Sequence, residues 1–163
     1  CWEIAIKNKN TPSVIALSRQ KLSYINPILS KDNKCLLGAY EVNLTSHESN
    51  ITLVASGSEV ELALEVQKEL NALKIHSKVV SMPCQELFDQ QPIEYKNKIL
   101  EPESLIFTIE AGSISSWHKY QNDKGHAFGI DEFGESAPYK ETYEYFNLTS
   151  NKIVTHIQKF LRG

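Results

Sequence analysis

The sequence predicts an α/β fold, a mostly parallel sheet with helices on both faces. The first observation is a set of three short runs, at 51–56, 77–83 and 104–112, with the length and composition of strands. The run at 51–56 is apolar almost throughout, as expected for a strand that is buried on both faces. The second observation is that helical segments separate these runs. Alternating strands and helices are typical of a parallel sheet.

The N-terminal part of the chain contains weaker elements. Trp2 and Ile6 have helical spacing without a capping residue before them, which indicates the last turns of a helix. We therefore interpret the chain as the C-terminal piece of a longer polypeptide. The apolar run at 13–17 predicts a short strand. The polar, aperiodic segment 20–38 predicts a linker, and 38–44 is expected to form an edge strand.

The longest predicted helices are amphipathic. The apolar stripe of the segment 58–73 consists of Val60, Ala63, Leu64, Val66, Leu70 and Leu73. The stripe of the last helix, 149–163, consists of Ile153, Val154, Ile157, Phe160 and Leu161. Shorter helical segments are predicted after Pro83, after Pro92, at 113–120 and at 136–146, and a further strand at 125–130.

Length and composition limit the classes of protein. The 163 residues suffice for one domain, or for one domain and part of another. The net charge of -3, with acids and bases interleaved, argues against nucleic acid and anionic membranes as partners. No apolar segment approaches the length of a membrane span. The three cysteines, Cys1, Cys35 and Cys84, are odd in number and widely spaced, which favours free thiols in the cytoplasm.

The segment SGSEVE, 56–61, is a candidate anion site because a glycine turn precedes a helix start. It lacks the glycine spacing of a dinucleotide fingerprint or a P-loop. Glu59 and Glu61 would repel an anion, and Ser58 with Glu61 matches a capping box. We therefore favour the capping box over an anion site.

Two further candidates follow strands or turns. Glu110 lies at the carboxyl end of a predicted strand, where ligands bind in open α/β sheets. It could equally cap the next helix or accept hydrogen bonds from a turn, and capping is the favoured interpretation. Ser136 lacks the second glycine of a nucleophile elbow. We expect it to be an N-cap, with Pro138 in the first helical turn.

The remaining candidates are histidines, aromatic residues and one arginine. None of the histidines has metal-ligand spacing, and each is expected at the surface or in packing; they are His47, His76, His118, His126 and His156. Trp117 and Tyr120 suit an interface or internal packing equally well. Arg19 follows Ser18, which comes directly after the apolar run at 13–17. Its charge alone favours a surface ion pair over a carboxylate or phosphate site.

Six short motifs occur in one order: ALSRQKL, GAY, ASGSEVELA, VVSMP, IEAGSISSWHKY and FGESAP. Together they resemble the C-terminal end of transketolases, thiamine-diphosphate enzymes of the pentose phosphate pathway. The resemblance extends from Trp2 to Leu161. The motifs SGSEVELA, VSMP and FGESAP, in this order and at these separations, are specific to that family.

The resemblance implies a fold and domain boundaries. The expected fold is a three-layer α/β/α arrangement around a mixed, mostly parallel five-stranded sheet with one antiparallel strand. Residues 1–22 would be the tail of the pyrimidine-binding domain, 23–37 a linker and 38–163 the C-terminal domain.

The resemblance also implies a function. Transketolases move a two-carbon ketol unit from a ketose phosphate to an aldose phosphate, and their LSRQ arginine, here Arg19, binds the substrate phosphate. The catalytic residues and the sites for thiamine diphosphate and Mg²⁺ or Ca²⁺ would lie upstream, with none among these residues. The full-length enzyme is expected to be a homodimer and this fragment to be inactive. The alternative is a regulatory small-molecule module, with the SGSEVE turn and Glu110 as its crevice.

Overall fold

The computed structural model describes residues 1–25, 32–43 and 49–162. Its α-helices are α1 (Trp2–Lys7), α2 (Glu59–Ala72), α3 (Gln85–Asp89), α4 (Ile93–Leu100), α5 (Tyr139–Tyr145) and α6 (Ser150–Arg162). Two 3-10 helices are η1 (Lys34–Leu37) and η2 (His118–Tyr120). The strands are β1 (Tyr40–Glu41), β2 (Ile51–Ala55), β3 (Ser77–Ser81), β4 (Leu105–Ile109) and β5 (His126–Phe128). No helix within these ranges is long and apolar enough to span a membrane.

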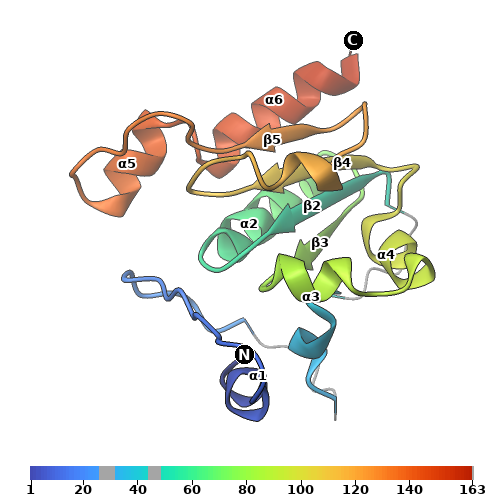
Figure 1. Cartoon of the computed structure of the whole chain (residues 1–163). Coiled ribbons are helices and arrows are strands. Elements are labelled where there is room, and N and C mark those ends of the chain that lie inside the picture. The colour runs from blue at the N-terminus through green and yellow to red at the C-terminus, as the bar shows by residue number, and fades with distance from the viewer. Residues whose placement is uncertain (26–31, 44–48, 163) are drawn as a thin grey trace.

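One five-stranded sheet organises the fold (Figure 1), in the order β1-β3-β2-β4-β5. The four strands β2 to β5 are parallel, and β1 pairs antiparallel with β3. The predicted mixed sheet with one antiparallel strand is therefore confirmed. The expected edge strand at 38–44 forms only over Tyr40–Glu41, and its last residue, Leu44, lies outside the described residues.

Helices α2 and α6 cover one face of the sheet. Residues at alternate positions of β2, such as Ile51 and Leu53, point into this layer because strand side chains alternate between faces. There they pack against α2 residues such as Val66 and α6 residues such as Ile157, all fully buried. The apolar stripes predicted for both helices are confirmed in their central turns, where the helices lie over the sheet.

The ends of those stripes differ from the prediction. Leu73 is 47% exposed because α2 ends at Ala72 and the chain turns away through Lys74, which has a φ of 62°. Phe160 and Leu161, in the last turn of α6, are 41% and 43% exposed. One edge of Phe160 still contacts the sheet, because its ring centroid lies 5.8 Å from that of the buried Phe107 in β4.

The opposite face is covered by α3, α4 and η2. Val54, Val80 and Ile106 point to this side and pack against Phe88 of α3 and Ile99 of α4. The sheet thus lies between two helical layers with separate cores, and the three-layer prediction is confirmed. Residues 38–162 contain both cores.

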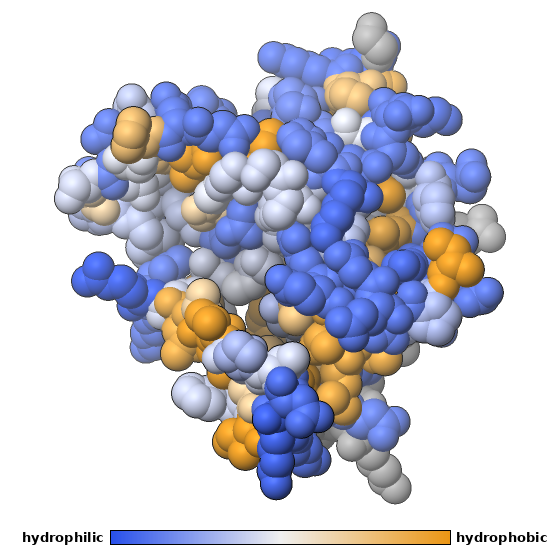
Figure 2. Space-filling model, viewed as in Figure 1, coloured by the Kyte–Doolittle hydropathy of each residue, from blue (hydrophilic) through white to orange (hydrophobic). Residues whose placement is uncertain are grey.

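The N-terminal segment, residues 1–25, has no core of its own. Helix α1 forms as expected, without a side-chain cap at Cys1. The strand predicted at 13–17 is wrong: these residues have no regular structure, and Val14 is 96% exposed. A strand needs a neighbour for its backbone groups, and none of the sheet pairs involves this segment. Figure 2 shows apolar colour gathered over the lower part of the molecule, where the segment lies in Figure 1.

Candidate functional site

The candidate site is the edge of the sheet where β2 and β4 end. From β2 the chain passes through α2 to β3 on one side, and it later returns to β4 on the other side. Such a reversal leaves a crevice at the carboxyl ends of the two strands, where ligands bind in open α/β sheets. A hollow of about 320 Å³ lies there, lined in part by Ser56, Met82, Glu86, Glu110 and Trp117.

The turn after β2 does not form the predicted capping box. Ser58 is the N-cap residue of α2, but its side chain makes no capping bond, and its hydroxyl donates to Glu59 Oε1 at 2.8 Å. Its φ of -65° and ψ of -30° are helical, whereas a capping serine needs extended backbone so that its hydroxyl reaches the N–H groups ahead. Glu61 instead accepts from the backbone N–H of Ser23, at 3.4 Å.

Acidic side chains line this edge of the sheet. Glu59 is only 4% exposed and accepts a hydrogen bond from the hydroxyl of Tyr143 in α5. Burial, and then this contact with Glu59, raise the pKa of Tyr143, so its hydroxyl stays protonated and continues to donate. A buried carboxylate beside the first turn of α2 opposes a bound anion. The expectation that SGSEVE is not an anion site fits this arrangement.

Glu110 follows β4 and bridges to the turn after β2. Its Oε2 accepts from the hydroxyl of Ser56 at 3.0 Å, and the next 3-10 helix, η2, has no side-chain cap. Of the interpretations above, accepting a hydrogen bond from a turn is therefore correct and capping is wrong. Burial raises the pKa of Glu110, Ser56 opposes this shift, and the charge of Glu59 adds to it.

Arg19 lies beside the same edge. A side chain on Gly57 would begin 3.9 Å from the Ser18 hydroxyl, so residue 18 rests over the Gly57 turn. The Ser23 bond to Glu61 holds the other end of this short segment against α2. Arg19 between them is exposed, and within the described ranges its guanidinium has no ion pair or hydrogen bond. The favoured surface ion pair is absent from the described part of the chain.

The other predicted residues separate into packing and surface positions. Trp117 and Tyr120 are 3% and 5% exposed. Their rings contact each other, and the ring of Tyr120 also contacts Phe88 in the core, so internal packing is the correct alternative. Ser136 is exposed and is not an N-cap, because α5 begins at Tyr139 with Pro138 as its N-cap residue.

The fold also brings together two histidines that are far apart in the sequence. His126 of β5 and His156 of α6 stack with ring centroids 4.5 Å apart. They are distant in the chain, so no local spacing could indicate the pair. His47 lies outside the described residues. Among the described residues, no three His, Cys, Asp or Glu side chains gather as a metal site would require.

Comparison with known proteins identifies the domain. The family described as the transketolase-like C-terminal domain matches residues 38–149. A transketolase from Sinorhizobium medicae is 39% identical over 99% of this chain. A transketolase structure from Leishmania mexicana is 34% identical, covers 99% of this chain and superposes with a TM-score of 0.88.

A second solved structure carries a ligand. Transketolase from Pichia stipitis, in complex with sedoheptulose-7-phosphate, is 32% identical, covers 79% of this chain and has a TM-score of 0.72. The chain covers 18% of that protein and 23% of each of the other two, so it spans about a quarter or less of their length. The order of strands, the single antiparallel strand and these matches agree, and the chain belongs to the transketolase family, of which it contains the C-terminal domain.

Proposed function

We propose that this chain is the C-terminal part of a transketolase that transfers a two-carbon ketol unit between sugar phosphates in the pentose phosphate pathway. The observation that carries the proposal is Arg19, an exposed cation held beside the Gly57 turn with no partner among the described residues. The sugar phosphate bound to the Pichia stipitis relative supports a phosphate as the missing partner.

The domain boundaries are part of this proposal. Residues 1–22 belong to the pyrimidine-binding domain, 23–37 form the linker and 38–163 form the C-terminal domain. The apolar side chains of the first segment support this division, because Trp2 is 65%, Ile6 73% and Leu17 70% exposed in this chain. Such side chains are normally covered by a neighbouring surface, and upstream domains of the same polypeptide would supply it.

The cofactor and its metal are assigned to those upstream domains. The described residues of this chain do not fit them: they contain no three-residue metal cluster, and the buried Glu59 and partly buried Glu110 occupy the edge where a diphosphate would approach. Thiamine diphosphate, with Mg²⁺ or Ca²⁺, would provide the carbanion chemistry in the whole enzyme, which we propose to be a cytoplasmic homodimer. The three cysteines are free, which suits a reducing compartment.

We infer that this chain alone is inactive. Adding thiamine diphosphate, Mg²⁺, a ketose phosphate and an aldose phosphate to the purified chain should give no transfer, because we assign the cofactor site to the upstream domains. A full-length transketolase assayed beside it is the positive control. Turnover by the chain alone, retained after a second purification step, would contradict the inference.

In the whole enzyme, Arg19 binds and orients the substrate. A guanidinium presents two parallel N–H groups to phosphate oxygens, which fixes direction as well as supplying charge. The two anchoring contacts of residues 18 and 23 limit how far the segment around Arg19 can move. The side chain would therefore hold the phosphate end of the sugar while the ketol end reaches the cofactor.

The test is Arg19→Ala in the full-length enzyme. For phosphorylated sugars, we expect kcat/KM to fall by a factor that corresponds to about 1.5–3 kcal/mol of lost transition-state stabilisation, the range for a hydrogen bond to a charged group. The loss for unphosphorylated sugars should be much smaller. Lys21→Ala, which removes an exposed cation two residues away, is the matched control. Equal losses on phosphorylated and unphosphorylated sugars would argue against a phosphate role.

A second candidate function is a regulatory small-molecule module within the same enzyme. The hollow beside Glu110 at the reversal of the strand order favours it. Glu86 and Glu110 on its walls favour neutral or cationic ligands over phosphates. A thermal-shift screen of neutral and cationic metabolites tests it, with nucleotides and sugar phosphates as the anionic comparison. At about 100 times Kd a ligand should stabilise the chain by about 2.7 kcal/mol, and Glu110→Ala should remove that shift.

A further inference from the structure

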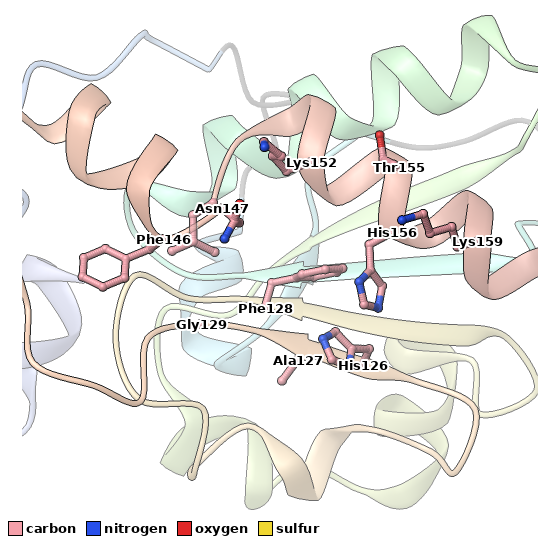
Figure 3. A pocket seen from close by; sticks show the side chains of 11 residues that line it. His126, Ala127, Phe128, Gly129, Phe146, Asn147, Lys152, Thr155, His156 and Lys159 are labelled. Carbon is pink, nitrogen blue, oxygen red and sulfur yellow. The ribbon is translucent and has the colours of Figure 1, made fainter.

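A second hollow lies at the outer side of the sheet, between the edge strand β5 and helix α6 (Figure 3). Its volume is about 420 Å³. Among the described residues, strand β5 pairs only with β4, and no further strand covers this side of the sheet. The walls include Phe128 from β5, Asn147 before α6, and Lys152, His156 and Lys159 along one side of α6.

Two imidazoles meet in this hollow. In Figure 3, His126 on the strand and His156 on the helix point toward each other, and their ring planes are inclined by only 22°. Phe128 meets the two rings edge-on, with centroids 4.9 Å and 5.2 Å away. The pair is therefore held in a fixed orientation against an apolar wall.

The charged groups around this pair are mainly basic. Lys152, His156 and Lys159 are spaced so that they lie on one face of α6. Lys159 has no ion pair or hydrogen bond within the described residues. Lys152 lies 3.8 Å from Glu144 of α5, and both side chains are more than half exposed, so this contact is weak. Glu144 is the only acid among the described residues that pairs with a base of the hollow.

The hollow also offers a neutral hydrogen-bond donor. The side-chain amide of Asn147 lines it together with the two lysines, whereas the hydroxyl of Thr155 donates to the backbone carbonyl of Asn151 at 2.8 Å. Phe128, Phe146 and Leu148 contribute an apolar wall. Small-molecule sites typically combine an apolar wall with a few converging polar groups, and here those groups are cationic or donors.

We propose that the hollow between β5 and α6 binds a small phosphate-bearing ligand, with its anionic group held by Lys152, Lys159 and imidazole N–H groups and its apolar part against Phe128. The acid-lined hollow at the carboxyl edge has the opposite charge, so the two would select different ligands. This proposal does not rest on the function of Arg19, which lies in another segment.

Binding at this place should depend on pH. Burial, and then the neighbouring His156, lower the pKa of His126. A dianion in the hollow would favour the protonated imidazole and raise that pKa. Between the lower pKa of His126 in the free chain and its higher pKa in the complex, binding is coupled to the uptake of a proton. The affinity for the anion should therefore increase as the pH falls through this range.

The experiment uses the 163-residue chain, with folding checked by circular dichroism. Calorimetry with inorganic phosphate at pH 7 should show one saturable site with a Kd of about 1 mM or tighter, and phenyl phosphate should bind more tightly because its ring contacts Phe128. Sulfate, which stays a dianion, is the probe for the pH series. Its affinity should rise from pH 7.5 to pH 6 by at most about tenfold per pH unit, the limit for uptake of one proton.

Substitutions distinguish a specific binding site from nonspecific electrostatic attraction. Lys159→Ala should weaken phosphate binding about tenfold or more, and Lys159→Arg should restore most of it. Lys68→Ala, an exposed lysine of α2, should have no effect. His126→Phe keeps an aromatic ring and should flatten the pH dependence for sulfate. Absence of saturation at about 10 mM phosphate, or equal losses in Lys159→Ala and Lys68→Ala, would overturn the proposal.

Discussion

Residues 1–25 and residues 38–162 use apolar side chains in opposite ways. In the second region Phe107, Leu53 and Ile157 are fully buried between sheet and helices. In the first region Trp2, Val14 and Leu17 face solvent, and α1 has no buried residue. Apolar content alone does not distinguish the two regions. The difference lies in whether each segment finds a surface against which to pack.

This difference separates the residues that stabilise the fold from the residue that we propose to bind substrate. The domain of residues 38–162 has the buried area that stabilises a fold, whereas the N-terminal segment carries Arg19, the proposed phosphate ligand. Among the described residues, the contacts between them include Ser18 beside Gly57, Ser23 with Glu61, and Ile25, which packs against the core of the sheet, α2 and α6. Substitutions in the two regions should therefore differ in what they change, and by how much.

The largest effect is expected for Phe107→Ala. Phe107 is fully buried in the middle of β4 and contacts Phe128 and Phe160. Removing its ring should lower the free energy of unfolding by about 3–5 kcal/mol, because a cavity is left in a close-packed layer. Urea unfolding of the chain measures this. Phe133→Ala, at a position that is 98% exposed, is the control and should change stability by less than about 0.5 kcal/mol. Similar losses in both variants would contradict the assigned core.

A smaller effect is expected for Glu101→Gln. The ammonium of Lys78 is buried in the sheet, with the side chain 2% exposed, and pairs with Glu101 Oε1 at 2.6 Å. After the substitution, only neutral acceptors remain for the ammonium: the amide oxygen of the new glutamine and the carbonyl oxygen of Lys98, at 3.3 Å. A buried cation without its anion should lower the free energy of unfolding by about 2 kcal/mol. The exposed Glu103→Gln is the matched control, and an unchanged urea midpoint in Glu101→Gln would show that the ion pair contributes little.

The smallest effect on this chain is expected for Val14→Ala. Val14 is 96% exposed, so the free energy of unfolding should change by less than about 0.5 kcal/mol. Val79→Ala, at a fully buried strand position, should cost several times more. In the full-length enzyme the same Val14→Ala should become destabilising if upstream domains cover the segment. A loss above about 1 kcal/mol in this chain alone would mean that residues 1–25 pack more tightly than we describe.

Individual residues show why part of the fold can be predicted from the sequence. The continuous apolar run of β2 and the stripes of α2 and α6 are local patterns, and local patterns predict the element and its buried face. Residues 13–17 have a similar apolar pattern and still form no strand, because a strand also needs a partner. Lys78 shows the converse: a charged residue lies inside β3 because Glu101, distant in the chain, pairs with it.

In the candidate site, too, some features can be predicted from the sequence and others depend on the tertiary structure. The motif around Arg19 is visible in the sequence, and so is the position of Glu110 after a strand. The choice between capping and a turn contact for Glu110 depended on Ser56, which another strand brings within 3.0 Å. Likewise, Ser58 has the residue type of a capping box and lacks the backbone geometry. Such choices depend on angles and distances that no spacing of residue types specifies.

By itself, the sequence determined the class of fold, the order of its elements, the family and the arginine to examine, because these depend on local periodicity and on motifs. Only the tertiary structure decided that His126 and His156 share a hollow, that carboxylates occupy the edge near Gly57, and that the N-terminal segment lacks a core in this chain. The physical reason is that charge, burial and packing are set by neighbours in space, and those neighbours lie far apart along the chain.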